Sequence, residues 1–274
     1  MSFNSMQGLT NLQGVVETIF GYFMAMGLTM PRAMGAVSVI PIFTQVGLTG
    51  LLRTGFVVAI ALPLLPYTIN EMQQFGELGI GHITAVVLKE GFIGLIIGFI
   101  FGLPFWGVQS AGDIADFQRG LMGANIGDPS QSSEASITAT FLLLVMITLF
   151  LVTGGMMVVI ETLYQSYLIW PLLDLSPKLT LESGTLFLKA LDDIMRLAFV
   201  VGGPVIIAMF LGDAVLAAIT RFAPQLNVFV LSMGVKSAIF VAFMPIYAVF
   251  IIDYMGEAFT PLRDVADQFQ RMIR

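Results

Sequence analysis

Long apolar stretches alternate with short polar ones along the chain, and this pattern predicts a series of membrane-spanning helices. Crossing a bilayer takes about 20 apolar residues. Thr138–Ile160 meets that length without a charged residue and is the clearest predicted span. Three further stretches are long enough but contain charged residues: Ile83–Val108, Leu186–Leu211 and Asn227–Ile252.

The N-terminal third is more fragmented. Its apolar pieces, which are short for spans, are Val15–Met30, Ala33–Val46 and Gly55–Ile69, and its prolines are Pro31, Pro41 and Pro63. Because proline removes a backbone donor and kinks or ends a helix, these residues predict breaks. The whole pattern predicts an all-α, polytopic membrane protein of six to eight broken helices that form helical hairpins.

Several charged residues lie well inside these apolar stretches: Asp192, Asp193, Arg196, Asp213 and Lys236. One Lys or Asp at the centre of a membrane helix costs about 2.5–3.5 kcal/mol, so these side chains cannot all face lipid. Asp192 and Arg196 are four residues apart and can pair on one helix face, which offsets part of that cost. We therefore expect these helices to face protein or water, as in a subunit buried within a larger assembly.

The remaining polar positions suggest an orientation in the membrane. Lys89 and Glu90 lie near one end of their apolar stretch, where we expect them to snorkel. The predicted loop Asn70–His82 has no Lys or Arg and favours the non-cytoplasmic side, whereas the tail after Asp253 carries arginines and favours the cytoplasm. We expect one unit with N-terminal helices (1–109), a central segment (110–136), C-terminal helices (137–252) and a cytoplasmic tail (253–274).

The composition supports a membrane protein. Hydrophobic residues make up 57% of the chain, charged residues make up 11%, and the mean hydropathy is +0.91. A soluble domain has about a quarter of its residues charged. The chain has no cysteine, which excludes disulfides and thiolate metal sites. The net charge of −6, without a basic block, gives no reason to expect a nucleic-acid partner.

Catalytic chemistry has little support. The single histidine, His82, lies in a polar stretch, and the chain lacks the HExxH, GxSxG, Walker A and GxGxxG motifs. Asp192 and Asp193 are adjacent, so they point to different helix faces and do not make an acid–base pair. We expect no enzyme activity, no cofactor and no metal site, although the scattered carboxylates leave a cation site as an open alternative.

The stretch GDIADFQRGLMGANIGDPSQSSEAS, residues 112–136, is polar and glycine-rich between two very apolar segments. The spacing of Ile114, Phe117 and Leu121 predicts a short amphipathic helix over Asp113–Leu121. Glycines and the Asp-Pro turn at 128–129 then interrupt regular structure. Two interpretations stay open. One is an ordinary loop outside the membrane; the other is irregular backbone at membrane depth, which survives only where protein covers it or water lines it.

Two other patterns also allow two interpretations. Gly94, Gly98 and Gly102 form a small-xxx-small ladder that lets a helix approach closely, either within this chain or from a partner. In RFAPQLNVFVLSMGVKS, residues 221–237, Pro224 breaks the chain before an apolar helix, Asn227 is placed to cap that helix, and Lys236 lies deep inside it. Lys236 is either satisfied within the fold or makes an inter-subunit or pore-facing polar contact.

The segment APQLNVFVLSMGVKS resembles the signature of the FliR/SctT family, the T-type subunit of the type III secretion export gate. The central GDIADFQRG…DPS is similar to that family's central loop, and length, hydropathy and motif order agree over most of the chain. Asp116, Gln118, Arg119 and Gly120 give the central motif a form closer to the injectisome branch than to the flagellar one. Gly234 stands where members often have proline, so the bend near Lys236 is permitted but not imposed.

The resemblance implies a subunit that assembles with R- and S-type subunits, and with the U-type switch subunit, into a pseudo-hexameric helical cone. It further implies a multi-pass protein of the bacterial inner membrane, with part of the assembly above the bilayer on the periplasmic side. The substrate would be unfolded exported protein. The central loop, 110–136, would help close the pore.

On this interpretation the gating residues are Gly112, Asp113, Asp116, Phe117, Gln118, Arg119, Gly120, Met122, Gly123 and Gly127. The residues expected in assembly or polar lining are Pro224, Asn227, Lys236, Asp192 and Arg196.

A self-contained secondary transporter is the alternative from another class. Broken helices and charges at membrane depth also fit such a protein, with Asp113, Asp116 and Arg119 binding a small ion or solute. An intramembrane enzyme has only scattered carboxylates in its favour.

Overall fold

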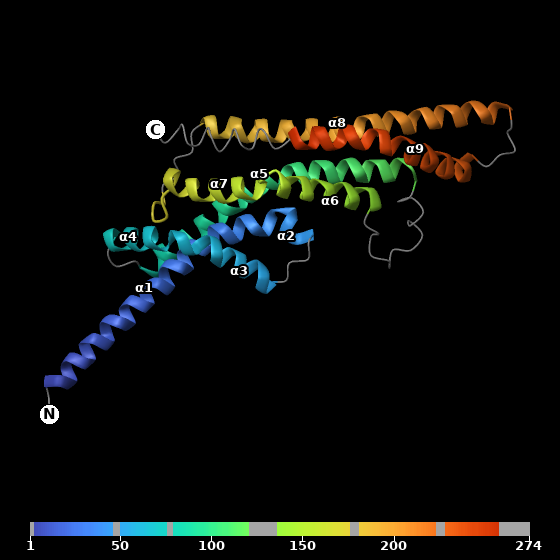
Figure 1. Ribbon diagram of the computed structural model, residues 1–274. Coiled ribbons are helices and arrows are strands. Elements are labelled where there is room, and N and C mark those ends of the chain that lie inside the picture. The colour runs from blue at the N-terminus through green and yellow to red at the C-terminus, as the bar shows by residue number, and fades with distance from the viewer. Residues whose placement is uncertain are drawn as a thin grey trace. The chain divides into compact units, whose positions relative to one another are not determined.

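Pro31 lies inside one continuous helix, α1 (Phe3–Val39), so the break expected at this proline is wrong (Figure 1). A proline in a helix interior costs about 3 kcal/mol or more because it removes a hydrogen bond. Leu28 and Val37, on either side of Pro31, are buried, and their packing offsets that loss. The break expected at Pro41 is confirmed, because α1 ends before it and α2 begins with it.

The computed structural model describes residues 3–45, 50–75, 79–120, 136–175, 181–222 and 228–257. The further elements are α2 (Pro41–Gln45), α3 (Gly50–Ala61), the 3₁₀ helix η1 (Leu62–Leu64), α4 (Leu65–Phe75), α5 (Ile80–Gln118), α6 (Ile137–Val152), α7 (Gly155–Ile169), α8 (Leu181–Phe222) and α9 (Val228–Glu257). The prediction of an all-helical, polytopic protein is confirmed. These residues contain nine α-helices rather than six to eight, because α2 is a separate short helix and the clearest predicted span is two helices.

Four helical stretches of the described chain are long and apolar enough to cross a membrane, and a broken pair, α6 with α7, makes up to five. The four are Gly50–Phe75, Ile80–Gln118, Phe199–Phe222 and Leu231–Tyr254. The stretch Asn70–His82 is not a loop over most of its length, because α4 continues to Phe75 and α5 begins at Ile80.

The uncharged stretch Thr138–Ile160 is not one span, because α6 ends at Val152 and α7 begins at Gly155. Gly154 has a φ of +79°, a left-handed conformation that glycine adopts without a steric penalty. The ring of Phe150 occupies the space where a side chain on Gly155 would lie. Two adjacent glycines therefore allow a break that hydropathy alone does not reveal.

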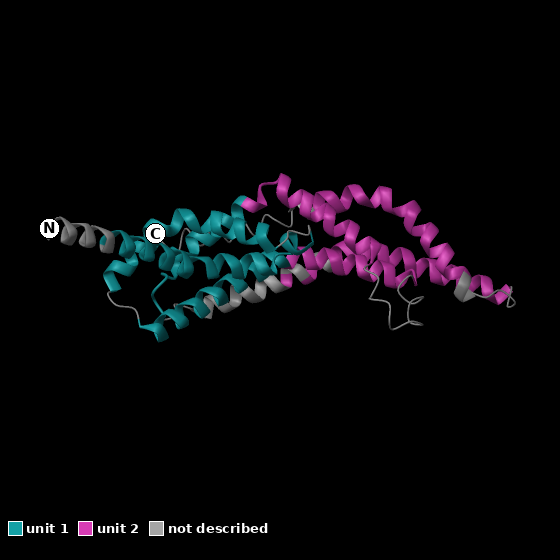
Figure 2. Cartoon of the chain, turned by 90° about the horizontal axis from the view of Figure 1, so that it is seen from below, with its two compact units in different colours: residues 1–102, 157–180, 266–274 teal, residues 103–156, 181–265 magenta. Residues whose placement is uncertain are grey.

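Figure 2 shows the chain divided into two compact units. Unit 1 comprises residues 1–102, 157–180 and 266–274, and unit 2 comprises residues 103–156 and 181–265. In unit 1, α1 packs against α3 and α4. It also meets α5 backbone to backbone: a Cβ on Gly94 would strike the carbonyl oxygen of Arg32, and one on Gly98 would strike that of Ala36. The glycine ladder therefore serves helix packing within this chain at these two positions.

Adding a methyl group to this ladder tests the close approach. Gly94→Ala is expected to destabilise the protein by about 1–3 kcal/mol, because α1 must move away from α5. Gly91→Ala is the matched control on the same helix: nothing lies within 4 Å of its Cβ position. That control should stabilise the protein by about 0.5–1 kcal/mol. Thermal unfolding of the two purified variants gives the comparison, and equal midpoints would rule out the close contact.

In unit 2, α8 and α9 pack against each other. The Tyr247 hydroxyl on α9 lies 3.1 Å from the carbonyl oxygen of Val200 and 2.9 Å from that of Val201 on α8. Asp192 and Arg196 lie within α8. Both side chains are exposed, and no ion pair joins them in the described part of the chain.

Candidate functional site

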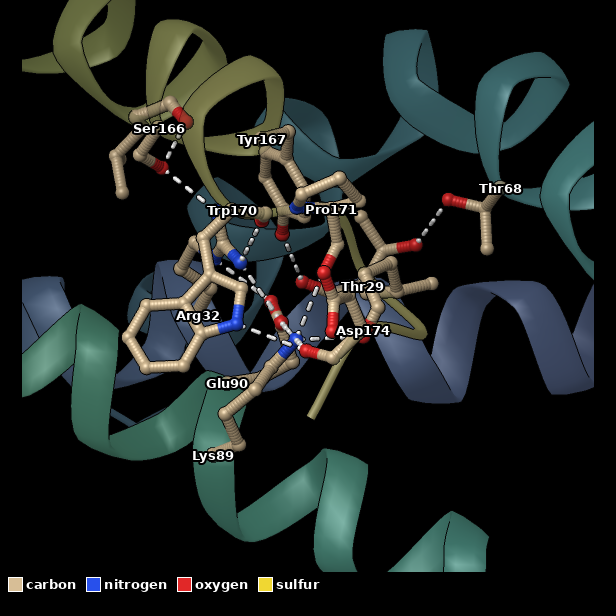
Figure 3. A network of polar contacts seen from close by, with 12 residues as sticks. Thr29, Arg32, Thr68, Lys89, Glu90, Ser166, Tyr167, Trp170, Pro171 and Asp174 are labelled. Atoms are coloured by element: carbon tan, nitrogen blue, oxygen red, sulfur yellow. Dashed lines mark hydrogen bonds and ion pairs between the residues drawn. The ribbon is translucent and has the colours of Figure 1, made fainter. Parts of the chain in front are cut away.

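Unit 1 contains a fully buried ion pair between α1 and α5 (Figure 3). Arg32 donates from Nε to Glu90 Oε2 and from Nη2 to Glu90 Oε1, each at 2.7 Å, and both side chains are 0% exposed. The guanidinium also donates to Ser166 Oγ at 2.8 Å and to the Trp170 carbonyl at 3.0 Å. It lies over the Tyr167 ring, 3.8 Å from the centroid. This bidentate geometry is the strongest form of a carboxylate–guanidinium contact.

Lys89 extends the same network and does not snorkel to an interface, so that expectation is wrong. Its ammonium lies 2.8 Å from Glu90 Oε1 and donates to three backbone carbonyls after α7. Those carbonyls belong to Pro171, Leu172 and Asp174. A desolvated ammonium needs three acceptors, and this turn supplies them. We call Arg32, Lys89 and Glu90 the charge network; its contacts leave it no free group for chemistry and show a structural role.

Unit 2 contains a second polar cluster, at the two ends of the central segment. Asp116, near the end of α5, accepts hydrogen bonds from the Ser136 hydroxyl at 2.6 Å, the Thr138 hydroxyl at 2.6 Å and the Thr138 amide at 3.0 Å. It also pairs with Arg119. Arg119 in turn donates to the Thr138 hydroxyl at 2.6 Å. We call these four residues the central anchor.

The central anchor satisfies groups that helix ends leave unpaired. Ser136 is the N-cap of α6 and accepts from the Ala139 amide at 3.0 Å, while the carboxylate of Asp116 takes the Thr138 amide. A negative charge at a helix N-terminus is stabilising. Burial lowers the pKa of Arg119 from its ordinary value, which is so high that the guanidinium stays charged at neutral pH.

Two side chains of α9, Lys236 and Phe240, contact the end of α5 and the central anchor. Lys236 donates to the Gln118 carbonyl at 3.0 Å, which satisfies an orphan acceptor at the end of α5. The Phe240 ring lies under the Arg119 guanidinium, 3.9 Å from its centroid. Lys236 also pairs with Asp213 on α8 at 2.6 Å. Of the two interpretations of Lys236, these contacts support a charge satisfied within the fold.

Two glycines, Gly112 and Gly120, allow close approach between α5 and its neighbours α6 and α9. A Cβ on Gly112 would strike the Cα of Ala139, so α5 and α6 touch at their backbones. Gly120 ends the described part of the segment with a φ of +80°, and Met233 on α9 lies 3.3 Å from its Cβ position. A larger residue at either position would push these elements apart.

The helical piece predicted from Asp113 is present as far as Gln118, as the last turns of α5. Its polar side is buried, with Asp116 at 1% and Arg119 at 8% exposed, whereas Phe117 is 70% exposed and Ile114 is 38% exposed. The usual amphipathic arrangement is therefore reversed, and the apolar side is the one left uncovered.

Several expected site residues lie outside the residues that the structure describes: Met122, Gly123, Gly127, Pro224 and Asn227. Asp113 is half-buried on α5 beside the central anchor. In the described ranges, no group of three or more His, Asp or Glu residues is arranged to hold a metal ion.

Comparison with known proteins adds a family to this geometry. Residues 23–262 match the model of a family described as bacterial export proteins, family 1. The chain belongs to the bacterial export proteins, family 1.

The relatives of this chain that carry names include proteins of secretion systems and of flagellar biosynthesis. The chain is 35% identical to the Yop proteins translocation protein T of Yersinia pestis over 86% of its own length and 90% of that protein. It is 31% identical to the surface presentation of antigens protein SpaR of Salmonella typhimurium, over 82% and 86% of the two chains. Identity to the flagellar biosynthetic protein FliR of Bacillus subtilis is 26%, over 82% and 86%.

The sequence analysis did not identify two of the four central-anchor residues, Ser136 and Thr138, nor one member of the charge network, Arg32. Ser136 and Thr138 are short polar residues at the start of an apolar run, which is an N-cap signal, but nothing local ties them to Asp116. Arg32 lies directly after Pro31, where the sequence predicts a helix break rather than a buried position. The signal in the sequence is that Arg32, Lys89 and Glu90 are all charged residues in an apolar background, where a buried charge needs a partner.

The hydroxyl of Thr138 is the simplest part of the anchor to remove. Thr138→Val is expected to destabilise this export protein by about 1–3 kcal/mol, because buried groups of Asp116 and Arg119 lose a partner. Thr140→Val is the control, since the Thr140 hydroxyl bonds only to the Ser136 carbonyl of its own helix at 2.9 Å. Chemical or thermal unfolding separates the two, and an unchanged Thr138→Val protein would contradict the anchor.

Proposed function

We propose that this chain is the T-type subunit of a type III secretion export gate, where it helps to form and close the pore for unfolded proteins. Membership of the export-protein family supports this, as do the names of its relatives: a translocation protein, a secretion system apparatus protein and a flagellar biosynthetic protein. Identity is higher to the Yop protein and SpaR than to FliR, which favours an injectisome over a flagellum.

The central anchor is the observation that carries the gating part of the proposal. It joins Asp116 and Arg119, in the first part of the central segment, to Ser136 and Thr138, at its end, so both ends of that segment are fixed to one place. A pore-closing element needs fixed ends, and a sliding substrate needs weak contacts from the part between them. Met122, Gly123 and Gly127 supply flexible side chains or none, and we assign them to the closing part.

The same proposal covers partners and location. The subunit assembles with R- and S-type subunits and with the U-type switch subunit into a pseudo-hexameric cone. It resides in the bacterial inner membrane, with part of the cone on the periplasmic side. The apolar side of α5 around Phe117, exposed in this chain alone, suits contact with such neighbours. No catalytic step is assigned to the subunit.

The transporter alternative needs a carboxylate that is free to bind an ion. Asp116 already accepts three hydrogen bonds and pairs with Arg119, so it has no coordination site to offer. This saturation supports a holding role over an ion-binding one.

Co-expression tests the proposed function. The chain is expected to purify with R- and S-type subunits in a stable hetero-oligomer, and to be degraded or aggregated without them. Native mass spectrometry of the purified material gives the composition. A stable lone monomer that binds a small solute would sink the export-gate proposal and favour the transporter.

A further inference from the structure

The last turn of α5 has a defined end. The Arg119 amide donates to the Ala115 carbonyl at 3.1 Å. The Gly120 amide donates to the Phe117 carbonyl at 2.9 Å. Gly120 then adopts a φ of +80°, the left-handed conformation with which glycine ends helices. The conformation of Gly120 therefore sets the direction in which the chain leaves α5.

Three side chains of α9 contact this end of α5, and we call them the α9 clamp: Met233, Lys236 and Phe240. They are three and four positions apart, so they share one helix face. Met233 Cγ lies 3.3 Å from the Cβ position of Gly120. Lys236 donates to the Gln118 carbonyl at 3.0 Å. The Phe240 ring lies under the Arg119 guanidinium, 3.9 Å from its centroid. Each clamp residue therefore contacts a different one of the last three residues.

Helix α8 holds the clamp in place. Lys236 pairs with Asp213 Oδ1 at 2.6 Å, so its ammonium lies between α8 and the end of α5. A Cβ on Gly212 would lie 2.9 Å from Ile239 Cδ1, which shows how closely α8 approaches α9 beside this pair. A cation is also stabilised next to the carbonyls at a helix C-terminus. Lys236 is therefore held by a charge on one side and caps α5 on the other.

The clamp and the central anchor hold the central segment in different ways. The hydrogen bonds of the central anchor join α5 to the start of α6, so they keep the two ends of the segment together. The clamp joins the first of those ends to α9. Without the clamp the two ends would stay together, but the chain at Gly120 would be free to turn relative to α9.

We infer that Lys236 is a positioning residue of the gate: with Met233 and Phe240 it fixes the direction in which the central segment leaves α5. The inference rests on the proposed function, in which that segment closes the pore. It adds that closure depends on α9 as well as on the central anchor.

Lys236→Met tests this role, because methionine keeps an apolar stem and removes the ammonium. At parental chain levels, ion leakage through the resting inner membrane should rise about tenfold, as expected from the loss of one charge-assisted hydrogen bond. Amide exchange at Arg119 and Gly120, measured by mass spectrometry on the purified complex, should accelerate by a similar factor. Lys236→Arg should restore most of both parental values, since a guanidinium also donates to the Gln118 carbonyl. Parental leakage or parental exchange in Lys236→Met overturns the inference.

Asp213→Asn is the matched control. It removes the ion pair with Lys236 but keeps an acceptor oxygen, and it leaves the bond to the Gln118 carbonyl in place. Leakage and exchange should therefore stay parental. Leakage as high as in Lys236→Met would show that the pairing of α8 with α9 causes the effect, and the positioning role would be wrong.

A second pair of variants gives the test if Lys236→Met does not accumulate. Phe240→Leu keeps an apolar side chain but removes the ring beneath Arg119, and it should raise leakage about threefold. Phe243→Leu removes a ring that stacks on Tyr247, with 5.2 Å between the centroids, and should leak no more than the parent. Equal leakage of these two variants would contradict the clamp.

These outcomes separate the inference from the proposed function. If the parent chain brings down no partner, the export-gate proposal fails. If Asp116→Ala leaks and Lys236→Met at parental levels does not, the central segment still closes the pore and only the clamp is wrong.

Discussion

Arg32→Met is expected to lower the free energy of unfolding by about 3–5 kcal/mol, enough to remove most of the folded protein from cells. The substitution leaves the Glu90 carboxylate buried with Lys89 as its remaining counter-ion. It also removes the hydrogen bonds that the Ser166 hydroxyl and the Trp170 carbonyl accept from the guanidinium. Steady-state membrane levels and thermal unfolding of the purified variant measure the loss.

Two further variants show whether the loss comes from the network. Arg196→Met removes an exposed arginine and should change stability by less than about 0.5 kcal/mol. Arg32→Met combined with Glu90→Met removes both members of the pair and should recover part of the loss, since no carboxylate stays unpaired. A single Arg32→Met protein as stable as its parent would show that the charge network adds nothing.

Asp116→Ala is expected to impair export about tenfold or more and to raise ion leakage through the inner membrane. The alanine removes an acceptor of three hydrogen bonds and leaves Arg119 buried without its counter-ion. The two ends of the central segment then keep fewer contacts, chiefly the Arg119–Thr138 hydrogen bond, and a closing element with loosely held ends cannot seal reproducibly. Secretion assays and a potential-sensitive dye in intact cells give the two readouts.

Asp116→Asn separates charge from hydrogen bonding. The amide oxygen still accepts from Ser136 or from the Thr138 amide, so leakage should be intermediate, while Arg119 loses its ion pair. Chain levels and co-purified partners must match the parent for either variant to be informative. Parental secretion without leakage in an Asp116→Ala strain would remove the anchor from the gating mechanism.

Features of the structure that depend on the local sequence, such as the presence of apolar helices, could be predicted. Hydropathy identified the helices, and the spacing at Asp113–Leu121 predicted the helical end of α5 as far as Gln118. Helix continuity was harder to predict, because it is decided by packing that the local sequence does not contain. Pro31 is held inside α1 by buried neighbours, whereas Gly154 breaks an uncharged run by adopting a left-handed conformation.

For the charged residues too, the need for a partner could be predicted from the local sequence, but the identity of the partner could not. The sequence predicted that charges in apolar helices face protein or water; Lys236 is covered by protein, whereas Asp192 and Arg196 are exposed in this chain. Arg32 and Glu90 are fully buried. The sequence did not identify their partners, because Glu90 meets a residue 58 positions away and Asp116 meets residues across the central segment. Long-range pairing depends on which helices become neighbours, and no local pattern carries that information.

The separation between Arg32 and Glu90 also constrains how the protein is made. The ribosome synthesises Arg32 before its counter-ion, which follows 58 residues later. Because the folded protein buries both side chains completely, α1 can reach its final packing only after α5 has been synthesised as far as Glu90. The order of synthesis therefore delays the docking of the first helix.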